Sequence, residues 1–362
     1  MPMRVTVSLH PHAKIGLAPE WAQQQVARGY DGLWYGEAKH NPFLALTLMA
    51  EHTERIRFGS NVAVAFARSP YVTANHAWDL QDYSGGRFIL GLGTQVKGHN
   101  ERRFSVPWGP PSPRLREYVE CMKAIWHTWQ TGDKPNYEGK YYRYSLDAWN
   151  WNPGPIEHPD IPVVIAAVRP RNTRLAAEVC DGVLWHGMMS FAYRDQVLLP
   201  ELEEGARRSG RDLKDMVVSG GGFVITAKDE DRLREQMAEQ KRWMSFYAST
   251  RTYQDSMKMA GLEEEANLLH RLSIDQDWDE MVKVISDDFL AEYAVVATWD
   301  ELVPKLRERY GGINTEIQFR ADLDNPEDEE QIREIISQIK KIPSYGEVEP
   351  SFRQTAETAG TT

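Results

Sequence analysis

Five histidines each follow a predicted β-strand, and their placement is the first indication of chemistry in this sequence. They are His10, His12, His40, His99 and His186. An imidazole titrates near neutral pH and can act as a general acid or base. In a parallel α/β sheet the carboxyl ends of the strands lie at one edge, where active sites assemble. One such histidine is usually structural, but five at one edge indicate a site. No histidine spacing typical of a zinc-binding helix occurs, so no metal site is expected.

A basic stretch follows the strand that ends in Gly91-Leu92-Gly93-Thr94. Glycines at a strand end let a ligand approach the backbone closely. Against the single acid Glu101, the stretch from Gln95 to Arg116 carries five cations: Lys97, Arg102, Arg103, Arg114 and Arg116. Guanidinium groups bind phosphate and carboxylate through paired hydrogen bonds. We therefore expect an anion site here, with a solvated basic loop as the alternative. A dinucleotide fingerprint is not indicated, because Val96 stands where its third glycine would be.

A second basic turn lies at Ala166–Thr173, where a buried strand leads directly into a helix. The N–H groups of a helix start attract anions, and Arg169 and Arg171 add positive charge. The alternative is an ordinary strand-to-helix turn with Pro170 in the first helical turn. Two such turns in one chain favour an elongated, phosphorylated ligand.

Two further features leave a structural and a functional interpretation open. A Gly59-Ser60-Asn61 interruption in the strand Ile56–Val64 predicts a bulge, which either curves a barrel or presses the backbone against a flat ligand. Four indoles suggest an apolar or aromatic substrate, although they could equally pack as core. These are Trp108, Trp149, Trp151 and Trp185.

Alternating strands and helices must position these residues. Eight strands are predicted, at Val5–Leu9, Gly32–Tyr35, Ile56–Val64, Arg87–Leu92, Pro162–Ala167, Gly182–Trp185, Val217–Thr226 and Thr315–Phe319. Helices with a proline in the first turn are predicted at Pro19, Asn41-Pro42 and Ser69-Pro70. This order predicts a parallel α/β sheet, and periodicity alone leaves a closed barrel and an open doubly wound sheet as alternatives.

Composition narrows the possible partners. The 362 residues carry a formal charge of −11, which argues against nucleic-acid and anionic-membrane binding. No apolar run approaches the roughly 18 residues of a membrane span, and the first residues show no export signal. Cys121 and Cys180 are isolated, which indicates neither disulfides nor a thiolate metal cluster. We therefore expect a cytoplasmic protein that binds a small molecule.

Taken together, these motifs resemble the luciferase-like monooxygenase superfamily, particularly actinobacterial members that use the deazaflavin coenzyme F420. The resemblance covers most of residues 3 to 325. Its segments are Trp34-Tyr35-Gly36-Glu37 before Asn41-Pro42, Gly59-Ser60-Asn61-Val62, Ser84-Gly85-Gly86-Arg87-Phe88 leading to Gly91-Leu92-Gly93-Thr94, and Asn152-Pro153-Gly154-Pro155 before Ile161-Pro162-Val163. It implies one (β/α)8 TIM barrel over residues 1–343, with insertions at about 95–160 and 229–287. Residues 344–362 are expected to be a disordered tail.

The resemblance also implies a cofactor site. The cofactor would be F420, with FMN as the alternative, and a cis peptide bond at Asn61-Val62 would support its ring. The implied contacts are Ser60, Asn61, Val62, Gly93, Thr94, Gln95, Lys97, Arg102, Arg103, Val168, Arg169, Pro170, Arg171 and Asn172. Relatives that oxidise sugar phosphates have a catalytic histidine directly after the second strand, where this chain has Glu37-Ala38. That sugar-phosphate reaction is therefore not implied.

The expected reaction is hydride transfer between F420 and a small organic substrate. Such a transfer needs a proton donor, for which Glu37 and His40 are the candidates. The substrate pocket is expected to include His10, His12, His99, Trp185 and His186. The alternatives are a two-component monooxygenase that uses reduced FMN and a non-catalytic flavin or deazaflavin carrier. Because relatives often form dimers, we also expect a homodimer.

Overall fold

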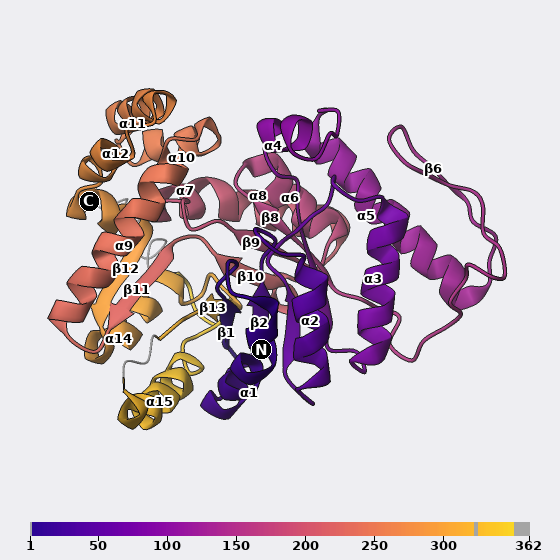
Figure 1. The fold of residues 1–362 in the computed structure, drawn as a ribbon, viewed down its shortest axis with the longest axis horizontal. Coiled ribbons are helices and arrows are strands. Elements are labelled where there is room, and N and C mark those ends of the chain that lie inside the picture. Colours follow the sequence, from indigo (N-terminus) through magenta and orange to yellow (C-terminus); the bar gives the residue numbers. More distant parts are fainter. Residues whose placement is uncertain (1, 322–324, 351–362) are drawn as a thin grey trace. The chain divides into compact units, whose positions relative to one another are not determined.

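The computed structural model describes residues 2–321 and 325–350. Its eight main parallel strands form a closed barrel, as the resemblance implies (Figure 1). In chain order they are β1 (Arg4–Leu9), β2 (Gly32–Tyr35), β3 (Arg57–Ser60), β5 (Phe88–Gly93), β8 (Val163–Ala167), β9 (Gly182–Trp185), β10 (Val217–Gly220) and β13 (Glu316–Gln318). Pairing runs β3-β2-β1-β13-β10-β9-β8-β5, and a β3–β5 pairing closes the ring. The open doubly wound sheet is thereby excluded.

The predicted helix starts are confirmed, two of them by a capping hydrogen bond. The Asn41 side chain accepts the Phe43 N–H at 3.0 Å and begins α2 (Pro42–Glu51). The Ser69 hydroxyl accepts the Val72 N–H at 3.2 Å and begins α3 (Pro70–Tyr83). In α1 (Ala18–Arg28) a proline stands in the first turn. Each start combines a side-chain acceptor or a proline with a fixed backbone, which is why these boundaries were readable from sequence.

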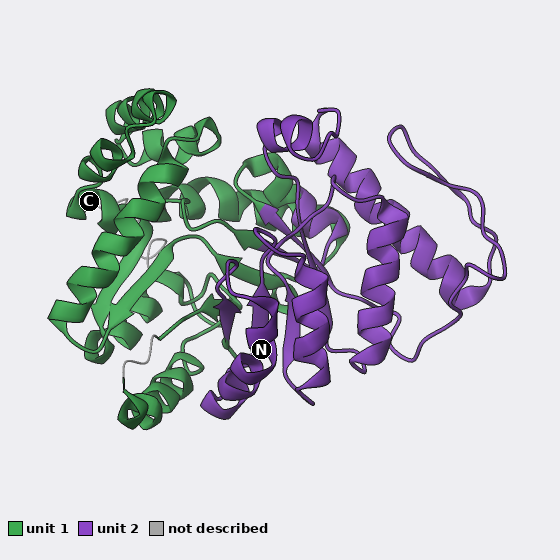
Figure 2. Cartoon of the chain, in the orientation of Figure 1, with its two compact units in different colours: residues 1–5, 167–174, 184–362 green, residues 6–166, 175–183 purple. Residues whose placement is uncertain are grey.

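The chain divides into two compact units (Figure 2). Unit 2 comprises residues 6–166 and 175–183 and holds α1, α2 and α3. It also contains the first expected insertion, made of α4 (Lys97–Arg102), α5 (Pro111–Thr131), and a hairpin of β6 (Tyr137–Glu138) and β7 (Arg143–Tyr144). A short strand, β4 (Ala63–Val64), follows β3 after a break at Asn61 and Val62. The expected bulge in the third strand is therefore a true interruption.

Unit 1 comprises residues 1–5, 167–174 and 184–362, of which 2–5, 167–174, 184–321 and 325–350 are described. The helix α6 (Pro170–Val179) begins in it. Its other helices are α7 (Phe191–Tyr193), α8 (Leu199–Ser209), α9 (Glu230–Ala248), α10 (Gln254–Met259), α11 (Glu263–Asp275), α12 (Trp278–Val284), α13 (Asp287–Tyr293), α14 (Trp299–Tyr310) and α15 (Glu329–Ile339). The helices α9 to α12 lie in the second expected insertion, at about 229–287, and α13 begins at its end. No described helix of either unit has the length and apolar character needed to cross a membrane.

One predicted strand is wrong in its extent. Residues 217–226 do not form one strand, because Gly220, Gly221 and Gly222 all have positive φ angles, of 85°, 78° and 129°. They separate β10 from β11 (Phe223–Ala227), which pairs instead with β12 (Ala294–Thr298) in a separate two-stranded sheet. Residues with side chains rarely adopt such angles, so the glycines allow the chain to leave the barrel here.

The start of the predicted disordered tail is folded in unit 1. Ser344 is buried, and its hydroxyl donates to the Asn314 carbonyl at 3.3 Å. The N–H of Tyr345 donates to the same carbonyl at 3.0 Å, and the Tyr345 hydroxyl donates to Glu203 at 3.1 Å. These hydrogen bonds hold residues that composition alone suggested were loose. Residues 351–362, which the same expectation covers, lie outside the described residues.

Candidate functional site

In unit 2, Glu37 is held in an ion pair at the end of β2. Its two carboxylate oxygens each accept a hydrogen bond of 2.8 Å from the Arg68 guanidinium, and one also accepts the Val64 N–H at 2.7 Å. The Glu37 N–H donates to the Val62 carbonyl at 3.1 Å. Paired guanidinium–carboxylate contacts of this kind are strong and directional. Glu37 thus ties the end of β2 to the segment from Val62 to Val64.

The segment after β3 contains the implied cis peptide bond, between Asn61 and Val62. The Ser60 hydroxyl before it is buried and couples β3 to β5, since it donates to the Gly91 carbonyl at 2.7 Å and accepts the Gly91 N–H at 2.9 Å. A Cβ at Gly91 would overlap the Ser60 carbonyl oxygen, and one at Gly93 would lie 2.6 Å from a Val62 methyl. Both glycines are therefore required where these strands approach each other.

The turn after β5 is organised by a residue that sequence reasoning missed. Asn100 is fully buried, and its amide donates to the carbonyls of Thr94 and Val96 at 2.9 and 3.1 Å. Its side-chain oxygen is buried without a hydrogen-bond partner. Gln95 takes a left-handed conformation, with φ of 56°, and its side chain contacts His99 Nδ1 at 3.1 Å. Burial, followed by the charges of Arg103 and Arg102, lowers the pKa of His99.

The five basic residues of this stretch fall into two groups. Arg114 donates to the Pro107 carbonyl and the Tyr142 hydroxyl, both at 3.0 Å, and Arg116 forms ion pairs with Glu178 and Glu120. These two guanidinium groups therefore stabilise α5, contrary to their expected place in the anion site. Lys97, Arg102 and Arg103 are exposed in or next to α4, and among the described residues only Lys97 has a carboxylate partner, Glu101 at 4.0 Å.

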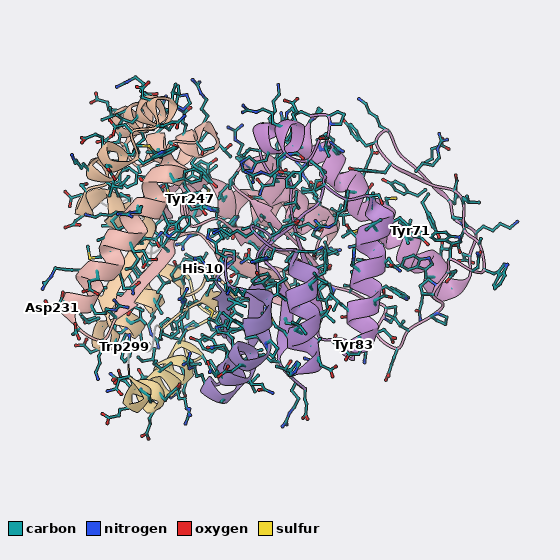
Figure 3. All side chains as sticks on the ribbon, viewed as in Figure 1. His10, Tyr71, Tyr83, Asp231, Tyr247 and Trp299 are labelled. Carbon is teal, nitrogen blue, oxygen red and sulfur yellow. The ribbon has the colours of Figure 1, made fainter. Side chains whose placement is uncertain are left out.

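Two of the predicted histidines of unit 2 follow β1. The His12 N–H donates to His10 Nδ1 at 3.2 Å, and the two rings meet edge to face with centroids 5.0 Å apart. An Nδ1 that accepts a hydrogen bond leaves the proton of a neutral imidazole on Nε2. His10, labelled in Figure 3, thus presents a donor at its far edge. His40 lies half-buried just before the Asn41 cap of α2.

In unit 1, the turn from Val168 to Asn172 begins α6, as predicted. Arg169 and Arg171 are exposed. In the described part of the chain neither of them forms an ion pair or a side-chain hydrogen bond. Trp185 is buried, and its indole N–H donates to the Thr173 hydroxyl at 3.4 Å. This indole therefore fixes the first turn of α6.

His186 lies among three aromatic rings of unit 1. Its ring centroid is 4.8 Å from Tyr247, 5.0 Å from Tyr253 and 6.3 Å from Phe223. The Met188 N–H donates to His186 Nδ1 at 3.1 Å, which leaves the proton on Nε2. Burial lowers the pKa of His186 to about 4. It is thus a neutral hydrogen-bond donor at physiological pH. Tyr247 and Tyr253, which come from the second insertion, were not predicted.

The triple glycine after β10 fits closely around a buried arginine. A Cβ at Gly221 would overlap the Arg194 side chain. Arg194 is almost fully buried, pairs with Asp195 at 2.6 Å and donates to the Arg309 carbonyl at 2.7 Å. Its guanidinium also lies over the rings of Phe191 and Tyr310. Neither the arginine nor the break it accompanies was predicted, because Gly221, Arg309 and Tyr310 are distant from Arg194 in the sequence.

The neutral state of His186 predicts a pH effect on stability. Below its ordinary pKa of 6.5 an unfolded chain binds a proton that the folded chain excludes down to about pH 4, so stability falls as the pH falls through this window. Between pH 7.5 and 5 we expect wild type to lose about 1 to 2 kcal/mol more of its free energy of unfolding than His186→Gln. Urea unfolding at both pH values measures this difference. His52→Gln, at an exposed histidine, should behave as wild type, and equal losses in all three proteins would contradict the prediction.

Known proteins resemble this chain in sequence and in fold. Residues 1–315 match the family described as luciferase-like monooxygenase. The chain is 43% identical over 285 residues to an uncharacterized protein of Mycobacterium tuberculosis, covering 79% of this chain and 84% of that protein. It is 36% identical over 194 residues to an F420-dependent glucose-6-phosphate dehydrogenase of Intrasporangium calvum, covering 51% and 55%. The structure of the coenzyme F420-dependent tetrahydromethanopterin reductase from Methanopyrus kandleri superimposes with a TM-score of 0.73 at 22% identity, covering 95% and 99% of the two chains, and confirms the barrel fold.

Proposed function

The chain belongs to the luciferase-like monooxygenase family, and from this premise we propose that it is an F420-dependent oxidoreductase. The proposed reaction is hydride transfer between the deazaflavin and a small apolar or aromatic substrate. Relatives that use F420 support the cofactor. The glucose-6-phosphate reaction of one relative is not transferred to this chain, because Glu37-Ala38 occupies the position expected for the catalytic histidine.

One observation carries the choice of an anionic cofactor. Arg102 and Arg103 after β5, and Arg169 and Arg171 after β8, are all exposed, and among the described residues no carboxylate pairs with any of them. Some other exposed arginines do have such a partner, for example Arg143 with Glu138 and Arg207 with Glu204. In a chain of charge −11, four unpaired guanidinium groups at the strand ends suit the phosphate and acidic tail of F420.

The residues present fit this cofactor. The orphaned side-chain oxygen of Asn100 and the left-handed Gln95 shape the turn after Gly93 and Thr94. We propose that the cofactor contacts are those predicted from the sequence: Ser60, Asn61, Val62, Gly93, Thr94, Gln95, Lys97, Arg102, Arg103, Val168, Arg169, Pro170, Arg171 and Asn172. Ser60 would act through the backbone, because its hydroxyl is committed to Gly91. When bound, F420 supplies two-electron hydride chemistry.

A proton must accompany the hydride, and the two predicted donors are not equivalent. The Glu37 oxygens already accept three hydrogen bonds from Arg68 and Val64, so donation of a proton from Glu37 would require breaking an ion pair. His40 carries no such constraint. We propose His40 as the proton donor at the end of β2 and Glu37 as the residue that positions the Val62–Val64 segment. We also propose that His10 and His186, whose Nδ1 atoms each accept a backbone N–H, bind substrate oxygen atoms through Nε2, alongside His12, His99 and Trp185.

The proposal is tested by following the deazaflavin chromophore in the purified protein. Reduced F420 should be oxidised when compounds with a carbonyl or an activated alkene are added, and not in their absence. Oxidation that requires reduced FMN and oxygen instead would support the monooxygenase alternative. Tight F420 binding with no substrate-dependent oxidation across the panel would support the carrier. Both outcomes contradict hydride transfer to such compounds. A cytoplasmic location, consistent with the buried thiols of Cys121 and Cys180, belongs to the same proposal.

A further inference from the structure

Three hydrogen-bond donors meet in the aromatic cluster around His186 in unit 1. They are the Nε2–H of His186 and the hydroxyls of Tyr247, near the end of α9 (Figure 3), and of Tyr253, in the short helix η4 (Arg251–Tyr253). The imidazole centroid lies 4.8 Å from the Tyr247 ring and 5.0 Å from the Tyr253 ring, and the two phenol rings are 6.3 Å apart. Each donor thus belongs to a ring that packs against the other two.

Among the described residues, none of these donors has a hydrogen-bond partner. Nε2 of His186 and the hydroxyls of Tyr247 and Tyr253 are all unpaired there. The three side chains are half-buried, and the three atoms remain accessible to solvent. Donors partly withdrawn from water gain from an acceptor that a ligand brings. The cluster therefore offers three donors to a bound molecule.

The imidazole side of the cluster is fixed by its neighbours. The Met188 N–H donates to His186 Nδ1 at 3.1 Å, which orients the ring and leaves Nε2 as the donor. Gly187 lets Phe223 come close, because a Cβ at Gly187 would overlap the Phe223 ring. That ring meets the imidazole edge to face, with centroids 6.3 Å apart. Phe223 thus adds an apolar wall beside the donor.

The tyrosine side is held by a turn that links the two phenols. The Thr250 N–H donates to the Tyr247 carbonyl at 2.9 Å, and the Tyr253 N–H donates to the Thr250 carbonyl at 3.1 Å. Three residues after Tyr253, the Ser256 hydroxyl accepts the Ser190 N–H at 2.8 Å. Ser190 lies in the loop after β9, so this bond joins the two sides of the cluster. Residues held in this way lose little conformational entropy when a ligand binds.

Burial sets the protonation of the cluster. It raises the pKa of Tyr247, and it raises the pKa of Tyr253, to which Tyr247 adds. It lowers the pKa of His186 to about 4. Among the described residues, no charged side chain contributes to these three shifts. At neutral pH the phenols keep their protons and the imidazole is uncharged, so all three donors are neutral.

Two charged residues flank Tyr253 in the sequence, and both act elsewhere. The Arg251 Nε donates to His270 Nε2 at 3.2 Å. The Asp255 carboxylate acts on Tyr193, whose pKa is raised by burial and then by this charge. An ion bound at the cluster would therefore find no counter-ion there among the described residues, and burial of an unpaired charge is strongly unfavourable.

The indoles that the sequence suggested as substrate contacts are less suited to this role. Trp149 and Trp151 are 93% and 68% exposed, so they do not pack as core. The Trp185 N–H already donates to the Thr173 hydroxyl at 3.4 Å. Tyr247 and Tyr253, in contrast, combine aromatic surface with uncommitted hydroxyls.

An uncharged ketone conjugated to a carbon–carbon double bond fits these features. Its oxygen has lone pairs for more than one donor, and its flat apolar body suits the rings of Phe223, Tyr247 and Tyr253. When such a compound takes a hydride at carbon, negative charge gathers on the oxygen, where hydrogen-bond donors stabilise it. Phenols of raised pKa are poor acids, so they hold this oxygen without protonating it.

We propose that His186, Tyr247 and Tyr253 bind the carbonyl oxygen of an uncharged conjugated ketone, and that such ketones are the substrate class of this oxidoreductase. This assignment rests on the proposed function and narrows its substrate. The hydride, with reduced F420 as its source, and the proton assigned to His40 add to the two carbons of the double bond. That bond becomes single and the carbonyl group is retained. Tyr247 and Tyr253 are thus specificity-determining residues.

Fluorine NMR with three small probes tests the assignment. The probes are para-fluorobenzylideneacetone, a conjugated ketone; para-fluorocinnamate, which has a carboxylate on the same skeleton; and para-fluorostyrene, which has no oxygen. Wild type should bind the ketone at least about tenfold more tightly than the other two. Titrations of the full chain are made without cofactor and again with oxidised F420, so that the result does not depend on the cofactor.

Phenylalanine variants separate hydrogen bonding from packing. Tyr247→Phe and Tyr253→Phe each remove one hydroxyl and keep the ring. Each should weaken ketone binding by about 3- to 10-fold, and the double variant by about 10-fold or more. Binding of the styrene should be unchanged in both, because the aromatic surface remains. Urea unfolding of the variants should match wild type, since neither hydroxyl has a partner in the described structure.

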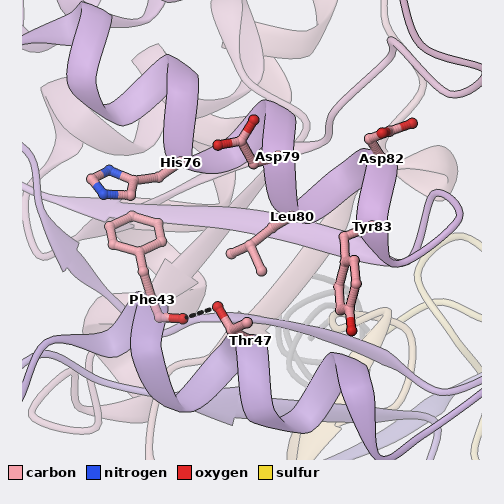
Figure 4. Close-up of a pocket in the computed structure, with 7 residues that line it drawn as sticks. All are labelled: Phe43, Thr47, His76, Asp79, Leu80, Asp82 and Tyr83. Atoms are coloured by element: carbon pink, nitrogen blue, oxygen red, sulfur yellow. Dashed lines mark hydrogen bonds between the residues drawn. The ribbon is translucent and has the colours of Figure 1, made fainter. Parts of the chain in front are cut away.

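A groove in unit 2 provides the control for binding elsewhere. It lies between α2 and α3, has a volume of about 410 Å³, and is lined by Phe43 and Tyr83 among others. Asp79 and Asp82 give it carboxylates that the cluster lacks (Figure 4). Tyr83→Phe removes a hydroxyl at this groove and should leave binding of all three probes unchanged.

Several results would overturn the assignment. They are ketone and cinnamate binding of equal strength, no ketone binding in either titration, and ketone binding that neither variant at the cluster weakens. Equal losses of ketone and styrene binding would show that the tyrosines act by packing, and would overturn it as well. Failure of the proposed function looks different. Ketone binding with the expected dependence on both tyrosines, without oxidation of reduced F420, would contradict the oxidoreductase and support the oxygen-binding site.

Discussion

Arg102→Ala/Arg103→Ala is expected to weaken F420 binding by about 100-fold. Each guanidinium bound to a phosphate or carboxylate contributes roughly 1.5 kcal/mol or more, which is about tenfold in affinity. Neither side chain pairs with a carboxylate in the described structure, and both are exposed, so their loss should not disturb the fold. Isothermal titration of wild type and the variant with F420 measures the change.

A paired arginine of the same unit provides the control. Arg143 is exposed in β7 and forms an ion pair with Glu138, so Arg143→Ala should leave F420 affinity unchanged. Raising the salt concentration should weaken binding to wild type more than to the double variant, because exposed charges are screened. Equal affinities in wild type and the double variant would show that these arginines do not hold the cofactor.

His40→Ala is expected to lower turnover by about 100-fold with little change in F420 affinity. Removal of a general acid typically costs this much, because the developing anion must take its proton from water. Once an active compound is identified, steady-state kinetics with saturating reduced F420 gives kcat, and fluorescence titration gives the affinity. Unchanged kcat in His40→Ala would reject His40 as the donor.

Glu37→Gln is expected to act mainly on stability. Glutamine cannot form the paired contact with Arg68, whose side chain is only 14% exposed, so we expect a loss of about 1 to 2 kcal/mol in the free energy of unfolding. The Arg68→Lys variant keeps the positive charge but loses the paired contact with Glu37. It should therefore lower the free energy of unfolding by less than Glu37→Gln does. A fall in kcat larger than that of His40→Ala, with unchanged stability, would instead assign proton donation to Glu37.

The strands and helix starts were predictable because they are local signals, whereas closure into a barrel was implied by the family resemblance. Asn41 and Ser69 cap helices two and three residues ahead of them, and such contacts depend on neighbouring residues alone. The Asn61–Val62 cis bond came from the family resemblance. The triple glycine at 220–222 was visible in the sequence. Its effect on the fold depends on Arg194 and on the pairing of β11 with β12, in which Phe223 and its partner Ala294 are 71 positions apart.

The site was predictable by residue type but less so by role. The sequence singled out Glu37 and could not show that Arg68, 31 residues away, occupies its carboxylate. It grouped Arg114 and Arg116 with the anion site, whereas Tyr142 and Glu178 bind them in the structure. It gave no signal for Tyr247 and Tyr253 beside His186, because only the folded insertion brings them there. Contacts between distant residues account for each of these differences.

The central claim is that this member of the luciferase-like monooxygenase family uses F420. Parallel titrations of the full chain with F420 and with FMN, followed by intrinsic tryptophan fluorescence, test it most directly. The unpaired arginines predict an F420 dissociation constant at least about tenfold below that of FMN, because FMN lacks the acidic tail. Tighter binding of FMN than of F420 would contradict the claim.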